Sequence, residues 1–480
     1  MTTIAAAATL RSTAARPAVR GWVVAAAVYF LAVFHRSSLG VAGLLAEQRF
    51  GITAAQLGAF VLLQIGVYAA MQVPTGVLVD RYGPRRLLIA AAGLMAIGQL
   101  LFAVAPSYPL ALVARGLLGC GDAMTFISVL RYAAGKFSAR RYPVLLAITG
   151  TVGTVGNLLA TLPLEQLLEH VGWAPSFLLA GSLSAVTGAV VWALLDDGAA
   201  APTRLRRAHE VRAGIVSVSK RVRTAWSLPG TKLGFWVHFA SMTIATAFGV
   251  LWGEPYLVDG AGFTQSQAGA VLMSCVLVSG VSGPVVGWFI GRHPHLRITL
   301  VLGQCAATIT GWLSVVFVFG AHPPHLFIAV LFAVTMIGGP VSTVAFAVAR
   351  DYNSARIIGT ASGVVNVGGF LAAATVSIAF GQLLTLLGGL SAQHMRVALL
   401  VPVAVEAFGT WRVFVWVRRL RAVLAERQLE GEVVPVRVNR HFFWDARWEP
   451  DRQPHWQPHS QSYSQSHGEQ LRPEYEPLAG

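Results

Sequence analysis

The sequence predicts an all-α membrane protein with 12 transmembrane helices arranged as two six-helix bundles. Of its 480 residues, 55% are hydrophobic and only 12% are charged, and the mean hydropathy is +0.61. A water-soluble protein of this length needs a larger charged fraction to cover its surface. Twelve apolar stretches are long enough to cross a bilayer, which takes about 20 residues, and the positive charges between them fall on alternate connections.

The N-terminal segment 1–20 lacks the compact apolar core of a cleavable signal peptide, so we expect a cytoplasmic segment that stays in the protein. The first bundle, 21–195, contains stretches near 21–45, 55–79, 86–105, 109–131, 142–168 and 174–195. A basic segment, 196–232, is expected to be a cytoplasmic linker. The second bundle, 233–417, contains stretches near 234–257, 266–290, 297–320, 325–349, 357–387 and 396–417.

Residues 418–480 are expected to continue as a helix into the cytoplasm and then as a disordered tail. The segment "WRVFVWVRRLRAVLAERQLE" suits a helix. Beyond residue 431, the chain is rich in Pro, Gln, His and Ser, a composition that cannot bury a core.

The distribution of Lys and Arg predicts the orientation. The N-terminal segment and the connections after stretches 2, 4, 6, 8 and 10 contain 22 of them, whereas the connections on the other side contain only Arg49 and Arg396. This positive-inside pattern predicts cytoplasmic termini in a multi-pass protein of the cytoplasmic membrane. It also accounts for the net charge of +15 without a nucleic-acid partner.

Ionisable residues inside the apolar stretches are the strongest candidates for a functional site, because charge in a bilayer core is costly unless it faces protein or water. Arg36 lies about 22 Å along the first stretch at about 1.5 Å per residue, and Arg115 of the fourth stretch falls at a similar depth. Asp122 follows Arg115 two turns later on the same helix face, which puts it one layer deeper.

Two arginines near one carboxylate favour an anionic ligand, because the planar guanidinium matches carboxylate geometry. Asp122 could exchange a proton when an anion takes its arginine partner. His35 could be a second proton-responsive group. The alternatives are a packed, hydrogen-bonded His35, an Arg36 that snorkels toward the membrane surface, and a structural ion pair between Arg115 and Asp122.

Softer candidates for substrate contacts are Tyr29, Tyr68 and Asn366, each of which could instead form helix–helix hydrogen bonds. No metal-ligand spacing, nucleophile elbow or phosphate loop is present, so we expect no enzyme activity, no metal and no cofactor. The three cysteines fall within apolar stretches, so we expect no disulfide framework.

A loop motif and a faint repeat support two related halves. The segment "GVLVDRYGPRR" (76–86) follows the second stretch, and "GWFIGRHPHLR" (287–297) follows the eighth, with Gly291 where the first copy has Asp80. Repeated six-helix halves are typical of transporters. The first copy fits Gly-x-x-x-Asp-Arg-x-Gly-x-Arg-Arg through Gly76, Asp80, Arg81, Gly83, Arg85 and Arg86. The fourth stretch contains Arg-x-x-x-Gly-x-Gly-x-Ala as Arg115, Gly119, Gly121 and Ala123.

Both motifs resemble those of the major facilitator superfamily, over about residues 20–420. The resemblance implies a transporter in which the 76–86 loop gates the cytoplasmic end. The first span contains an arginine, and the fourth span contains an arginine followed seven residues later by an acid. This combination resembles the anion:cation symporter branch. That branch carries organic anions with protons or sodium. Here the acid is Asp122 instead of Glu, and His35 stands where sugar-acid carriers often have Asp.

The resemblance therefore implies a monomeric, alternating-access transporter that takes up a small organic anion with protons across the cytoplasmic membrane. The first alternative is a proton-driven efflux pump for drugs or metabolites, although "GTVGTVGNLLATLP" in the fifth stretch lacks the Gly-Pro signature of many such pumps. Nitrate porters use arginines in spans 2 and 8, and neither span contains one here. A non-transporting receptor that uses its tail is a third alternative.

Overall fold

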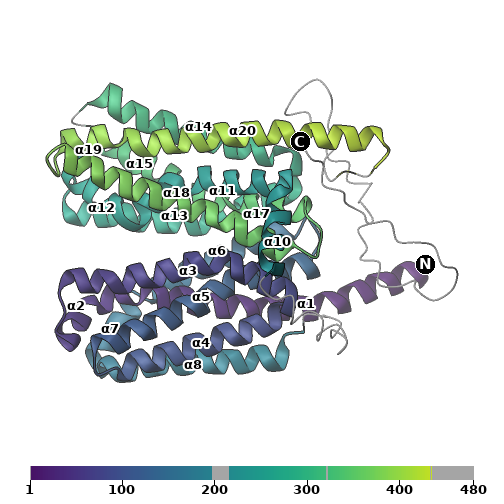
Figure 1. Ribbon diagram of the computed structural model, residues 1–480, viewed down its shortest axis with the longest axis horizontal. Coiled ribbons are helices and arrows are strands. Elements are labelled where there is room, and N and C mark those ends of the chain that lie inside the picture. The colour runs from purple at the N-terminus through teal and green to yellow at the C-terminus, as the bar shows by residue number, and fades with distance from the viewer. Residues whose placement is uncertain (1, 197–215, 321–322, 433, 435–480) are drawn as a thin grey trace.

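The computed structural model describes residues 2–196, 216–320, 323–432 and 434, and every regular element in these ranges is a helix. The helices form two stacked layers, each made from one half of the chain (Figure 1). The first half comprises α1 (Thr2–Ser37), α2 (Leu39–Phe50), α3 (Ala54–Tyr82), α4 (Pro84–Val104), α5 (Tyr108–Lys136), α6 (Tyr142–Leu159), α7 (Leu162–Val171) and α8 (Trp173–Leu194).

The second half begins with α10 (Val216–Ser227), α11 (Pro229–Ala247), η1 (Phe248–Trp252), α12 (Gly253–Pro255), η2 (Tyr256–Gly260) and α13 (Gln265–Arg292). It continues with η3 (Pro294–Leu296), α14 (Arg297–Ser314), η4 (Val315–Phe319), α15 (His325–Met336), α16 (Gly338–Val341), α17 (Thr343–Asp351), α18 (Ile358–Leu386), α19 (Ala392–Ala398) and α20 (Leu400–Leu429).

Eleven helical segments in the described ranges are long and apolar enough to cross a membrane. The expected stretch 234–257 is the one missing from that count. It lies in α11, η1, α12 and η2, where π-helical turns interrupt the α-helix. His238 and Glu254 are polar residues within this stretch. The prediction of an all-α membrane protein is confirmed.

Many large apolar side chains point outward, as expected of helices that face lipid. Leu62, Val281 and Leu326 are each more than 70% exposed. A water-soluble protein would cover such side chains or replace them, so the outer surface of both layers is suited to hydrocarbon.

Matching helix starts reveal the relation between the two halves. Thr53 caps α3 and Thr264 caps α13, and each accepts a hydrogen bond from the backbone N–H of a glutamine three residues later. In turn, the side-chain oxygens of Gln56 and Gln267 accept hydrogen bonds from the backbone N–H groups of Thr53 and Thr264. This reciprocal capping box satisfies two backbone groups at each helix start, and it marks α3 and α13 as equivalent elements of a repeat.

Several predicted boundaries differ from the observed ones. α1 begins at Thr2, inside the expected N-terminal segment, and the helix is interrupted at Ser38. The expected helical extension is present, because α20 runs to Leu429. Most of the expected linker (197–215) and nearly all of the expected disordered tail (433 and 435–480) lie outside the described residues.

Candidate functional site

An ion pair between α1 and α5 is at the centre of the candidate site. Arg36 Nε lies 3.1 Å from Asp122 Oδ2, and Arg36 Nη2 lies 3.3 Å from Oδ1. The Asp122 side chain is 1% exposed and that of Arg36 is 27% exposed. The carboxylate is therefore enclosed by protein, whereas the Arg36 side chain is only partly buried.

Glycines on α5 explain how the carboxylate comes to lie so deep. A Cβ atom at Gly119 would approach the Gln64 carbonyl oxygen of α3 to 2.8 Å, and one at Gly121 would approach the Ala91 carbonyl oxygen of α4 to 2.8 Å. The absence of side chains lets α5 pack closely against both neighbours. This close packing encloses Asp122 within the first bundle.

Arg115 has surroundings different from those of Arg36. It is 1% exposed; its Nη1 donates to the His35 carbonyl oxygen over 3.4 Å, and its guanidinium carbon lies 5.3 Å from the centre of the Phe102 ring. No ion pair to Arg115 is formed among the described residues. The sequence placed both arginines above Asp122, whereas Asp122 pairs directly with Arg36 and Arg115 supports the end of α1.

His35 is packed inside the first bundle. It is 1% exposed, and its Nε2 lies 2.6 Å from the Ser184 hydroxyl oxygen of α8. The Ser38 hydroxyl in turn donates to the His35 carbonyl oxygen over 2.8 Å. These bonds fix the break after α1, and with it the direction of the neighbouring Arg36.

Aromatic rings surround Arg36 and extend to the second half of the molecule. The Tyr29 side chain lies beside Arg36, and the guanidinium carbon is 4.9 Å from the Tyr68 ring centre. The Tyr68 ring lies 5.0 Å from that of Phe370 on α18. Arg36 therefore lies close to the boundary between the two halves.

Asn366 joins this boundary from α18. Its Nδ2 donates to Gln72 Oε1 over 2.6 Å, and Gln72 Nε2 donates to the Tyr68 carbonyl oxygen over 3.1 Å. Gln72 follows Tyr68 by four residues on a polar face of α3, a repeat that the sequence shows and that indicates helix–helix hydrogen bonds as readily as a ligand contact. The structure thus brings Tyr29, Tyr68 and Asn366 near Arg36.

About two turns further toward the end of α3, Asp80 connects the two halves. Its carboxylate accepts bonds from the backbone N–H groups of Gly359 (2.9 Å) and Thr360 (2.7 Å) and from the Thr360 hydroxyl (2.8 Å). These residues open α18, where a helix N-terminus favours negative charge. Arg131 Nε lies 3.2 Å from the same carboxylate. We call Gly76, Asp80, Gly359 and Thr360 the α3–α18 latch.

The remaining motif residues shape the turn after the latch. Gly83 has a φ of +82° between α3 and α4, a conformation that favours glycine. Arg85 Nη2 donates to the Trp192 carbonyl oxygen over 2.5 Å. The Arg81 guanidinium carbon lies 5.2 Å from the Tyr82 ring centre, and Arg86 is exposed.

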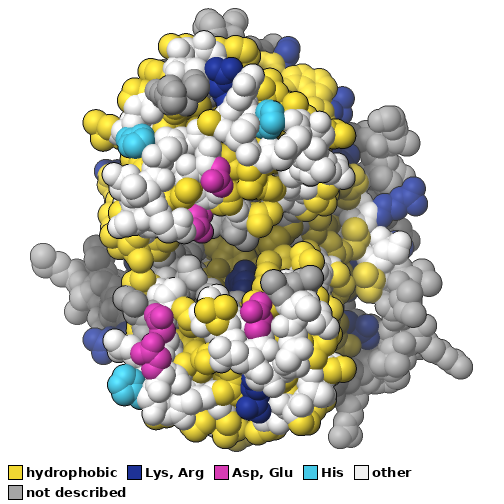
Figure 2. Space-filling view, turned by 90° about the vertical axis from the view of Figure 1, so that its left-hand side faces the viewer, with side chains coloured by type: hydrophobic (Ala, Val, Ile, Leu, Met, Phe, Trp, Pro, Cys, Tyr) yellow, Lys and Arg dark blue, Asp and Glu magenta, His cyan; other side chains and the backbone are white. Residues whose placement is uncertain are grey.

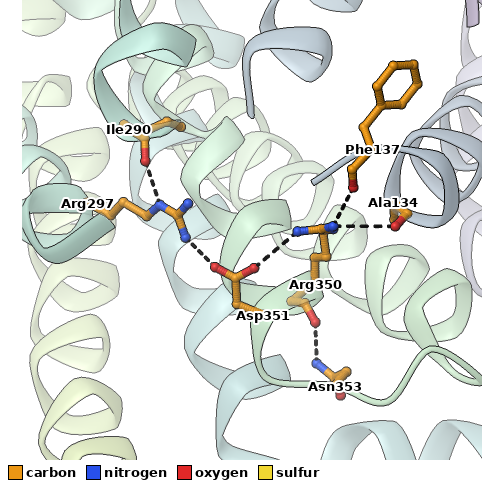
Figure 3. A network of polar contacts seen from close by, with 8 residues as sticks. Ala134, Phe137, Ile290, Arg297, Arg350, Asp351 and Asn353 are labelled. Carbon is orange, nitrogen blue, oxygen red and sulfur yellow. Dashed lines mark hydrogen bonds and ion pairs between the residues drawn. The ribbon is translucent and has the colours of Figure 1, made fainter. Parts of the chain in front are cut away.

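A second connection between the halves was missed by the sequence analysis (Figure 3). Arg350 of α17 donates to the Phe137 carbonyl oxygen over 2.7 Å, just beyond the C-terminus of α5. Asp351 lies 3.6 Å from Arg350 and 2.5 Å from Arg297. A cation at a helix C-terminus is stabilising, so this contact reinforces the same end as the latch.

The other end of the molecule, which carries α2, α7, α12 and α19, has a different surface. Figure 2 shows this end hollowed between the two halves, with a basic side chain visible in the hollow. The halves therefore meet at the latch end and part at the opposite end.

Within the described ranges, no group of three or more His, Cys, Asp or Glu residues could hold a metal ion.

Two related helical halves that meet at one end and part at the other, with an ion pair inside the first half, define a membrane transporter of the two-bundle class. The family model for the Major Facilitator Superfamily matches residues 25–377 and 234–448, and the chain belongs to this family.

Curated relatives include anion transporters. The chain is 24% identical over 376 residues to a protein named "Probable sulfoacetate transporter SauU" from Cupriavidus necator. The matched region covers 74% of this chain and 85% of the relative. The chain is 23% identical over 394 residues to a "D-galactonate transporter" from Escherichia coli, covering 77% and 90%. A shorter match, 40% identical over 117 residues, is to "Multidrug efflux pump LfrA" from Mycolicibacterium smegmatis and covers 24% and 23%.

A solved structure supports the fold. The FucP transporter in its outward conformation superposes with a TM-score of 0.59 at 14% identity, covering 83% of this chain and 99% of that one. Two predictions are confirmed: the chain belongs to the predicted superfamily, and it is a multi-pass protein of the cytoplasmic membrane.

Proposed function

We propose that this protein takes up a small organic anion together with protons across the cytoplasmic membrane, by alternating access. The observation that carries the proposal is the Arg36–Asp122 ion pair, in which a partly exposed arginine side chain is neutralised by an enclosed carboxylate. An anion that reaches Arg36 must compete with Asp122, and this competition links substrate binding to the protonation of the acid.

The proposed cycle follows from the cost of unpaired charge in a protein interior. When an anion takes the Arg36 guanidinium, Asp122 loses the partner that compensates its burial. A buried carboxylate without a cation is strongly disfavoured, so Asp122 takes up a proton. Release of that proton on the other side restores the ion pair and displaces the anion. Tyr29, Tyr68 and Asn366 would contact the bound anion.

Arg115 and His35 are proposed to act through Arg36. Arg115 bonds the His35 carbonyl oxygen, and the His35 ring bonds Ser184, so both hold the end of α1 in place. A direct contact of Arg115 with substrate and a proton-carrying role for His35 stay predictions.

For the topology, we propose 12 spans with both termini in the cytoplasm. The segment Pro229–Gly260 would be the seventh span. The start of α1 and the end of α20 project from the same end of the molecule (Figure 1), which supports an even number of spans. The domain division into 21–195 and 233–417, with a linker at 196–232, belongs to the same proposal. The latch would then close the cytoplasmic end, which corresponds to an outward-facing state.

The names of two relatives, a sulfoacetate and a D-galactonate transporter, support an organic anion as substrate. Efflux is the second candidate, and the short match to the multidrug pump LfrA favours it. That match covers less than a quarter of either chain, whereas the anion transporters match most of their length.

Transport by purified protein in proteoliposomes tests the proposal. Sulfoacetate, D-galactonate and ethidium would each be supplied with the pH gradient set in either direction. We expect accumulation of an anion only when the outside is acidic, and no movement of ethidium. Proton-driven export of ethidium, with no anion transport in either direction, would establish efflux instead. Vesicles with Arg36→Gln protein provide the control for leakage.

A further inference from the structure

A cluster of cations and tryptophans at the latch end has no role in the proposed transport cycle. The Lys232 amino group of α11 and the Arg419 guanidinium of α20 each lie 4.7 Å from the ring centre of Trp416. Lys232 also lies 5.9 Å from the Trp226 ring of α10. We define Lys232, Arg419, Trp416 and Trp226 as the basic–aromatic site.

The charges of this site are not balanced by the protein around them. Among the residues that the structure describes, neither Lys232 nor Arg419 has an acidic partner within 4.0 Å, and the two cations are close enough to repel one another. Like charges that share one ring are unfavourable unless an anion joins them.

Trp416 itself carries an unused hydrogen-bond donor. Trp416 is 8% exposed, and its indole N–H has no hydrogen-bond partner in the described part of the chain. A buried donor of this kind costs free energy unless a ligand or solvent satisfies it. Two cations and one N–H donor together suit an acceptor with several oxygen atoms, such as a phosphate group.

The surface next to the site indicates where that phosphate comes from. Along α20 toward the membrane, Phe408 and Trp411 are about half exposed. The guanidinium of Arg412, one residue on, lies 5.0 Å from the Trp236 ring centre. Aromatic and basic side chains at a membrane boundary contact acyl chains and headgroups together. A free phosphate would use the cations but gain nothing from this apolar wall.

We propose that the basic–aromatic site binds the phosphate headgroup of an anionic phospholipid, whose acyl chains lie along the exposed aromatic face of α20. The site joins α10, α11 and α20, which come from separate stretches of the chain. A bound lipid would therefore hold the segment before α11 against the last helix.

Native mass spectrometry of the full chain, released from mixed micelles, tests this proposal. Protein is equilibrated with phosphatidylglycerol or phosphatidylcholine, and the retained lipids are counted. Removing a basic residue weakens an anionic headgroup contact by about fivefold, so the double variant Lys232→Gln/Arg419→Gln should bind phosphatidylglycerol about 30-fold more weakly. Phosphatidylcholine retention should not change.

The control is Arg418→Gln/Arg427→Gln, which also removes two positive charges, both from α20 and neither in contact with Trp416. Equal loss of phosphatidylglycerol in both double variants would show general surface attraction and overturn the proposal. Equal retention in wild type and the Lys232/Arg419 variant would overturn it too. Stabilisation against heat by inorganic phosphate that matches the effect of phosphatidylglycerol would point to a free anion instead. Arg419→Gln alone, at an exposed position, serves if the double variant does not fold.

Discussion

The contact between Gly76 and α18 gives a sharp prediction about alternating access. A Cβ atom at Gly76 would lie 2.5 Å from the Gly359 carbonyl oxygen, whereas ordinary contact begins at 3.4 Å, so Gly76→Ala must push α3 and α18 apart by about 0.9 Å. Overpacking of this kind costs about 1–3 kcal/mol.

The three atoms nearest to the added methyl group belong to Gly359 and Thr360 of the opposite half, so its cost falls on the closed latch and disappears when the halves separate. At about 2 kcal/mol, the ratio of closed to open latch should fall about 30-fold. The matched control is Gly66→Ala on the same helix, where an added Cβ meets nothing within 4 Å. It should leave the ratio unchanged.

Spin labels at Arg86 and Arg292 allow the measurement, because both residues are exposed at the latch end, one on each half. The background lacks Cys120, Cys275 and Cys305. Double electron–electron resonance should show a longer distance population in Gly76→Ala and not in Gly66→Ala. Identical distributions in wild type and Gly76→Ala would refute the reasoning that backbone contact at Gly76 holds the latch closed.

Three further substitutions test separate contacts. Arg36→Lys keeps the charge but loses the forked geometry that pairs with carboxylates, and initial uptake in proteoliposomes should fall at least about tenfold; near-normal uptake would remove Arg36 from the site. Asp80→Asn loses the charge that holds Gly359 and Thr360, worth about 1.5–3 kcal/mol, and should lengthen the distance between spin labels at Arg86 and Arg292, whereas an unchanged distance would contradict the latch. His35→Gln should lower the thermal stability but keep the ratio of protons to anions, and a lost proton would assign coupling to His35.

Much of the fold could be predicted from the sequence, because lipid demands long apolar helices and the loop motif places Asp80 at a helix end. The π-helical turns that interrupt the helix within Phe248–Gly260 could not be predicted from the sequence, because such turns depend on packing. The capping boxes at Thr53 and Thr264 correspond to a Thr-x-x-Gln pattern in the sequence, which is further evidence that the two halves are repeats.

The candidate site was predicted only in part. Helix periodicity places Arg115 and Asp122 on one face of α5, but seven residues separate them by about 10 Å along the axis. Which arginine reaches the carboxylate depends on how α1 crosses α5, and the spacing of residues along a single helix does not reveal that crossing. Arg350 was missed because its partners are backbone carbonyl groups of the other half, which no side-chain pattern reveals.

The central claim is that an anion displaces Asp122 from Arg36 and so makes the protein take up a proton. Calorimetric titration of the purified protein with its anion, in buffers of different ionisation enthalpy, counts that proton directly. Wild type should take up one proton for each anion bound, and Asp122→Asn should bind the anion with none. Anion binding without proton uptake in wild type, or undiminished uptake in Asp122→Asn, would contradict the account.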